Sequence, residues 1–118
     1  MDVAEQLAHE LLRWWHSSSR SSATPDWLAP DITFDSGLGL LRGDEVATSV
    51  RQFCAWENVT ILASFGTGVQ AALIYEGIDP VTDLRRREAW IVSVVEGKIA
   101  HILAVDMISY ADTQSPRS

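Results

Sequence analysis

Two long, mainly apolar stretches lie near the C-terminal end of the chain, at residues 84–95 and 98–108. Both stretches are rich in β-branched residues, which favours strands. The Glu96-Gly97 pair between them is typical of a two-residue hairpin turn, because Gly readily adopts the positive φ that such a turn needs. The pattern therefore predicts an antiparallel hairpin in which Val95 lies opposite Lys98.

This register predicts two contrasting faces, because side chains alternate along a strand. One face is small and ends in a charge pair: Ser93 with Ala100, Ile91 with Ile102, Ala89 with Ala104, and Arg87 with Asp106. The other face is bulky: Val94 with Ile99, Val92 with His101, Trp90 with Leu103, and Glu88 with Val105.

The rest of the chain predicts helices followed by strands. Apolar residues with helical spacing predict amphipathic helices at 2–16 and 44–56, and Thr24-Pro25-Asp26 is typical of the start of a short helix. Further strands are expected at 31–35, 57–65 and 69–78, with a Gly-rich loop at 36–43. This order predicts an α+β fold in which one curved antiparallel sheet wraps around N-terminal helices as a cone-shaped barrel with a small-molecule pocket.

Composition limits the classes of function. The 118 residues are expected to form one domain at 1–110 with a disordered polar tail at 111–118. A net charge of −7 disfavours nucleic acid, and no apolar run is long enough for a membrane span. The single Cys54, expected in the core, excludes an internal disulfide, and no signal peptide is evident, so a cytoplasmic protein is expected. The three His lack metal-ligand spacing, so neither metal nor cofactor is expected.

Four segments together resemble the SnoaL-like, ketosteroid-isomerase-like branch of the nuclear transport factor 2 (NTF2) superfamily. They are the helix ending near Trp15, WLAPDITFD at 27–35, LRGDEVATSV at 41–50 and VEGKIAHI at 95–102. The resemblance implies that Ile102, Ala104 and Asp106 face the pocket, so that the small face is its wall. The bulky face would then lie outside and form a homodimer contact through Trp90, Leu103, Val92 and His101.

The resemblance also implies catalytic candidates. Limonene-epoxide-hydrolase-like members use an Asp-Arg-Asp set, with Arg and one Asp two apart on one strand and the second Asp on the next strand. Arg87 and Asp106 match two of the three, but the third position falls on Ala89, which carries no acid. A structural ion pair between two strands is the alternative interpretation of Arg87 and Asp106.

Asp35 resembles the general base of ketosteroid isomerases, at the end of the first strand. Alignment on the preceding Pro30-Asp31 places Ser36 there instead, and a solvated Asp that caps a turn is the simpler interpretation. The family's helix-1 Tyr is replaced by Trp14, Trp15 and His16; His16 could titrate, or it could be a surface residue.

These residues predict an acid–base enzyme (isomerase, cyclase or epoxide-hydrolase-like) acting on a small apolar molecule. The alternative is a non-catalytic ligand-binding or dimerisation module, favoured by Ala89 and by the missing helix-1 Tyr. The predicted ligand-binding residues are Trp15, Trp27, Trp56, Ile74, Ala89, Ile91, Ile102 and Ala104.

Overall fold

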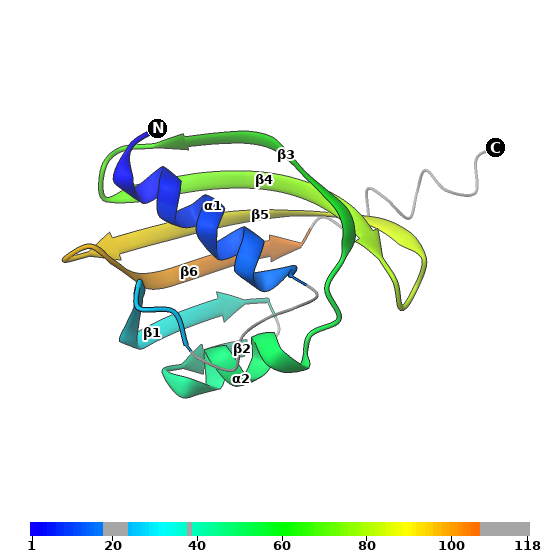
Figure 1. The fold of residues 1–118 in the computed structure, drawn as a ribbon, viewed down its shortest axis with the longest axis horizontal. Helices are drawn as coiled ribbons and strands as arrows, with labels where there is room; N and C mark the ends of the chain where they lie inside the picture. The colour runs from blue at the N-terminus through cyan, green and yellow to red at the C-terminus, as the bar shows by residue number, and fades with distance from the viewer. Residues whose placement is uncertain (18–23, 38, 107–118) are drawn as a thin grey trace.

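The computed structural model describes residues 1–17, 24–37 and 39–106. The elements in chain order are α1 (Val3–Trp15), β1 (Leu28–Ser36), β2 (Gly39–Arg42), α2 (Asp44–Gln52), β3 (Glu57–Gly66), β4 (Gln70–Asp79), β5 (Leu84–Val95) and β6 (Lys98–Asp106). The six strands form one curved sheet in the order β2-β1-β6-β5-β4-β3, and α1 lies across its concave face (Figure 1). The predicted α+β class is confirmed, although the sheet is mixed, because β1 runs parallel to β6.

The first helix begins at a side-chain cap and buries one stripe. Asp2 is the N-cap, and its Oδ1 accepts a hydrogen bond from the Glu5 backbone N–H at 2.8 Å. Its Oδ2 accepts the Gly68 backbone N–H at 3.0 Å, which ties the helix start to the β3–β4 turn. The buried stripe follows the helical period and consists of Ala4, Ala8, Leu11, Leu12 and Trp15.

The predicted hairpin turn is confirmed, but the register beyond it differs from the prediction. Val95 pairs with Lys98, and both turn residues have positive φ, +53° at Glu96 and +77° at Gly97. Val94 then pairs with Ile99, whereas Ser93 pairs with His101. A β-bulge at Ala100 therefore shifts every later pair by one residue.

The bulge changes which side chains lie opposite each other. Trp90 pairs with Ala104, and Glu88 pairs with Asp106. The predicted pairs of Ala89 with Ala104 and of Arg87 with Asp106 are therefore wrong. The sequence pattern contained no signal for the bulge. Both strands carry apolar residues on both faces, so either register brings apolar side chains opposite one another.

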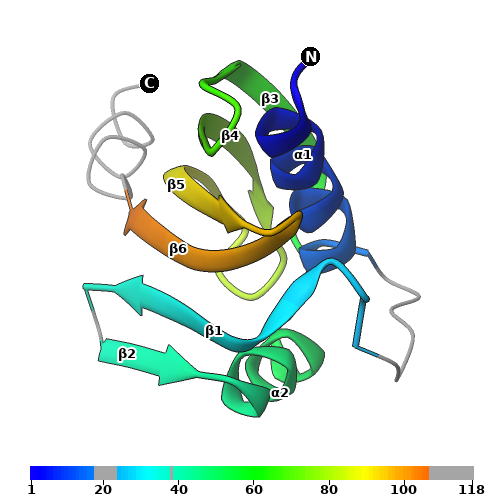
Figure 2. The same cartoon turned by 90° about the vertical axis from the view of Figure 1, so that its left-hand side faces the viewer.

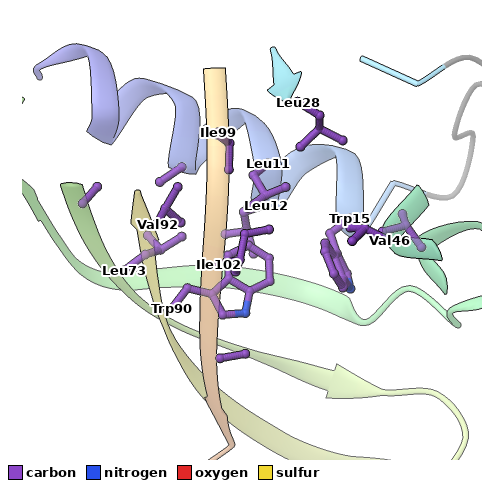
Figure 3. Close-up of a cluster of buried hydrophobic side chains, with 14 of the residues drawn as sticks. Leu11, Leu12, Trp15, Leu28, Val46, Leu73, Trp90, Val92, Ile99 and Ile102 are labelled. Atoms are coloured by element: carbon purple, nitrogen blue, oxygen red, sulfur yellow. The ribbon is translucent and has the colours of Figure 1, made fainter. Parts of the chain in front are cut away.

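The core contains the face that was expected to lie outside. Ile102 and Ala104 face the helices as predicted, but they do so together with Trp90, which is 1% exposed, and fully buried Val92. Figure 3 shows Trp90, Val92 and Ile102 among the side chains clustered with Leu11, Leu12 and Trp15 of α1. The other face of β5 is the outer one, where Ile91 is 42% exposed. Trp90 and Val92 therefore cannot form an outer-face dimer contact.

The N-terminal half of the sheet also differs from the expected elements. Asp26 and Trp27 lie in a turn rather than in a short helix, and β1 begins at Leu28. The Ile99 backbone N–H donates to the Trp27 carbonyl at 2.8 Å, so pairing with β6 outweighs the local helix signal. The predicted loop 36–43 contains β2, and α2 ends at Gln52, before the expected residue 56. Figure 2 shows α2 packed beside β1 and β2. The predicted tail, 111–118, lies outside the described residues.

Candidate active site

The three predicted catalytic residues do not come together. Asp106 ends β6 on the concave face, whereas the Arg87 side chain forms an ion pair with Glu76 at 2.9 Å on the outer face. Phe34 packs against the core, so strand alternation places its neighbour Asp35 on the outer face as well. The same alternation places Ser36, the alternative to Asp35, on the face of Phe34.

The arginine that meets Asp106 is Arg86. Its Nη2 lies 2.8 Å from Asp106 Oδ2, and its Nη1 lies 3.0 Å from Asp79 Oδ2. The Arg86 side chain is 17% exposed, and its guanidinium lies over the Trp56 ring, 5.8 Å from the ring centroid. An arginine that bridges two carboxylates holds both in fixed orientations.

Glu88 lies two residues from Arg86 on the same face of β5, directly opposite Asp106. Its Oε1 accepts two hydrogen bonds, from Tyr75 Oη at 2.6 Å and from Trp90 Nε1 at 2.8 Å. No described residue donates a hydrogen bond to its Oε2. A proton on Glu88 therefore belongs on Oε2, because Oε1 is already an acceptor twice over.

Burial raises the pKa of Glu88 above its usual value, and the hydrogen bonds from Tyr75 and Trp90 offset part of that rise. Burial, followed by the nearby charge of Glu88, raises the pKa of Tyr75 well above its usual value. Tyr75 therefore stays protonated and acts as a hydrogen-bond donor. A carboxyl group with a raised pKa and an unoccupied oxygen is suited to general-acid chemistry.

Aromatic rings surround this group. The Trp90 ring lies 5.0 Å from Tyr75 and 5.3 Å from Trp15, and the Trp15 ring lies 5.0 Å from Phe34 (centroid distances). The predicted ligand wall is split by the register shift. Trp15, Trp56, Ile102 and Ala104 belong to the core, and Trp27 packs beside it, whereas Ile74, Ala89 and Ile91 share the outer face.

Two cavities lie beside the core. One, of about 590 Å³, lies between α1 and the start of β3 and includes His16 and Trp56 in its wall. The other, of about 300 Å³, lies between the segment before β1 and the start of α2. Neither has Glu88 or Asp106 in its wall. The Asp106 side chain, directly opposite Glu88 at the end of β6, is 40% exposed, so we expect access to Glu88 from that end.

No group of three or more His, Cys, Asp or Glu side chains in the described ranges could hold a metal ion. Cys54 is exposed, so the prediction that it belongs to the core is wrong. None of the helices in the described part of the chain is both long and apolar enough to cross a membrane.

Sequence reasoning missed three members of this cluster: Arg86, Glu88 and Tyr75. Their shared face was predicted in part, since Glu88 was expected to lie on the same face as Trp90, and it does. A signal was present in the sequence: Arg86 and Glu88 have the two-residue spacing of the Arg-acid pair. It was hidden because the unbulged register placed Arg87, not Arg86, on the face of Asp106.

The architecture resembles that of several solved structures. A candidate ketosteroid isomerase from Kribbella flavida is 15% identical, with a TM-score of 0.72 over 88% of this chain and 77% of that one. An NTF2-like protein from Cytophaga hutchinsonii is 14% identical, with a TM-score of 0.69 over 93% and 95%. The chain has the NTF2-like fold. An LEH-like epoxide hydrolase of M. tuberculosis shares this fold, with 15% identity and a TM-score of 0.73 over 94% and 87%.

No family model and no curated protein sequence matches the chain. The predicted resemblance to ketosteroid-isomerase-like and SnoaL-like proteins is thus confirmed at the level of the NTF2-like fold. Identities below 20% to these proteins transfer no activity, so function depends on the residues at the site.

Proposed function

We propose that this NTF2-like chain is a cofactor-free acid–base enzyme of the epoxide-hydrolase type, acting on a small apolar epoxide. The observation that carries the proposal is the Arg86 bridge to Asp106, with Glu88 two residues from Arg86 on the same strand face. This is the carboxylate-arginine-carboxylate arrangement expected of limonene-epoxide-hydrolase-like proteins, with Glu in place of one Asp. The missing acid at Ala89 is thus replaced by Glu88.

The three side chains have different roles in the proposed reaction. Glu88 Oε2 donates its proton to the epoxide oxygen as one ring C–O bond breaks. Asp106 accepts a proton from the water molecule whose oxygen forms the new C–O bond to that carbon. Arg86 orients Asp106, and the product is a vicinal diol. Glu88 regains a proton and Asp106 releases one before the next turnover, so the cycle is balanced.

A non-catalytic ligand-binding module is the second candidate function. It is favoured by the aromatic rings that fill the interior around Glu88 and by cavities whose walls include neither Glu88 nor Asp106. The isomerase and cyclase alternatives have less support, because Asp35 lies on the outer face of the sheet.

The test is hydrolysis of a panel of cyclic and aryl epoxides by the wild-type protein in H₂¹⁸O. We expect diol formation above the uncatalysed rate, with one ¹⁸O in the product of the first turnover, because water attacks directly. Mass spectrometry of a single-turnover reaction measures this incorporation. A product that carries unlabelled oxygen in the first turnover would indicate a carboxylate ester intermediate, and a panel with no hydrolysed member would leave the binding module as the better proposal.

The predicted homodimer stays a prediction, with a different set of contact residues. Across the outer face, Phe65, Ala72, Ile91 and Leu103 lie opposite one another on four neighbouring strands. We propose a second copy of this chain as the partner, because a two-fold axis lets both copies bury the same apolar row. Light scattering at micromolar concentration should give a dimer for the wild type and a monomer for Ile91→Asp. A monomeric wild type would contradict this proposal.

The cytoplasmic location suggested by the single cysteine likewise stays a prediction.

A further inference from the structure

His16 follows the last residue of α1 and links two parts of the molecule. Its Nδ1 accepts a hydrogen bond from the Trp56 backbone N–H at 3.1 Å, and its Nε2 lies 3.3 Å from Tyr75 Oη. The imidazole also stacks near the Trp56 ring, with a centroid distance of 5.0 Å. It lies in the wall of the 590 Å³ cavity, and the Tyr75 hydroxyl that it contacts also donates to Glu88.

These contacts determine the tautomer of the neutral imidazole. A backbone N–H is only a donor, so His16 Nδ1 must be the unprotonated nitrogen, and the proton lies on Nε2. Nε2–H then donates to Tyr75 Oη, and the Tyr75 hydroxyl proton is directed to Glu88 Oε1. Every donor in this series points towards Glu88.

We infer that His16 is a positioning residue, which directs the Tyr75 hydroxyl at Glu88 Oε1 and thereby keeps the transferable proton of Glu88 on Oε2. The catalytic part of this inference rests on the proposed function, whereas the hydrogen-bond direction does not. The ionisable groups around the series are Tyr75 on β4, Glu88 and Arg86 on β5, Asp106 on β6, and His9 and Arg13 on α1 itself.

The alternative is that His16 only fastens the start of β3 to α1 through the Trp56 N–H. Two substitutions separate these roles, because they differ by one methylene. In His16→Asn the amide oxygen can still accept the Trp56 N–H, but the side chain is too short to reach Tyr75 Oη. In His16→Gln the longer amide can donate to Tyr75 Oη in place of Nε2–H.

The main measurement is the pH titration of the Glu88 carboxyl ¹³C signal, without substrate. His16→Asn should raise the pKa of Glu88 relative to the wild type, because a Tyr75 hydroxyl without its donor stabilises the carboxylate less well. His16→Gln should restore the wild-type titration. In the Tyr75→Phe background, His16→Asn should have no further effect, since the connection to Glu88 is already broken.

A matched control is available in the same cavity wall. His9 hydrogen-bonds Ser64 instead of Tyr75, at 3.1 Å, so His9→Asn should leave the Glu88 titration unchanged. Identical Glu88 titrations in the wild type and in His16→Asn would overturn the inference. An effect of His16→Asn that persists in Tyr75→Phe would overturn it too, because the effect would then bypass Tyr75.

The catalytic arm is measured separately. With an epoxide substrate, His16→Asn should lower kcat about tenfold at unchanged KM, since general-acid efficiency depends on the placement of the proton. An altered Glu88 titration in a protein that hydrolyses no epoxide would remove the proposed function and leave the positioning of Glu88 by His16 intact. An unaltered titration in an active hydrolase would overturn the positioning role of His16 and leave the proposed function intact.

Discussion

Replacing Glu88 by Gln is expected to lower kcat for epoxide hydrolysis by about 10²- to 10⁴-fold, because the amide has no proton to transfer. The Gln amide oxygen can still accept the hydrogen bonds from Tyr75 and Trp90, so the fold should be retained. Steady-state kinetics with a substrate from the epoxide panel measures the loss. Asp106→Asn should cause a loss of similar size, since water activation also requires a carboxylate.

The matched control for this substitution is Glu96→Gln. Glu96 is an exposed carboxylate in the β5–β6 turn, at the opposite end of β5, and its loss should leave kcat unchanged. A Glu88→Gln enzyme that retains the wild-type kcat would exclude Glu88 as the general acid.

The wild type and Glu88→Gln also test the burial of Glu88, through the pH dependence of their free energies of unfolding. Because burial raises the folded-state pKa of Glu88, the folded state binds this proton more tightly than the unfolded state does. The contribution to stability is fully present below the unfolded-state pKa and is lost as the pH rises through the folded-state pKa. Urea unfolding at a series of pH values should therefore show Glu88→Gln gaining stability relative to the wild type across that window. Parallel profiles would contradict the raised pKa.

Replacing Trp90 by Ala is expected to lower the free energy of unfolding by about 3–5 kcal/mol, a large share of the stability of a small domain. The Trp90 side chain is 1% exposed and contacts the rings of Trp15 and Tyr75, so its removal leaves a cavity between α1 and the sheet. It also removes one of the two donors to Glu88 Oε1. Urea denaturation monitored by circular dichroism measures the change.

Ile91, the next residue along β5, is the control for Trp90→Ala. It lies on the outer face and is 42% exposed. At a protein concentration where the chain is monomeric, Ile91→Ala should therefore lower the free energy of unfolding much less than Trp90→Ala does. Equal costs for the two substitutions would mean that the assignment of inner and outer faces is wrong.

The strand ends near the C-terminus were predictable from local signals, and the pairing between strands was only partly so. The apolar, β-branched composition of residues 84–95 and the Glu96-Gly97 turn predicted β5 with its observed bounds and the Val95–Lys98 pair. They did not predict the bulge at Ala100, which brings both Ile99 and Ile102 into the core, because the residues that pack there come from distant parts of the chain. The parallel pairing of β1 with β6 was missed for the same reason: it joins residues about 70 positions apart.

The candidate site was predicted only in part, because the pairing of β5 with β6 was predicted only in part. Asp106 was correctly expected on the concave face, since alternation within β6 holds beyond the bulge. Its arginine partner was misassigned by one position, as Arg87 instead of Arg86, and Glu88 was therefore placed on the outside. Because residues 85–87 are all arginine, both registers offer Asp106 an arginine partner. The burial of Trp90 against Trp15 distinguishes them, and it is visible only in three dimensions.

The extra residue at Ala100 has a consequence for variation in proteins of this shape. The bulge places Ile99 and Ile102, three positions apart, on the same inner face. A homologue that lacks residue 100 would have a straight strand here and would keep every later pair, because Ser93 would still lie opposite His101 and Glu88 opposite Asp106. The distance of an acid from the turn therefore does not identify the reactive groups that a substrate meets. Homologues that differ by one residue between positions 98 and 101 should be aligned by strand pairing rather than by counting from the turn.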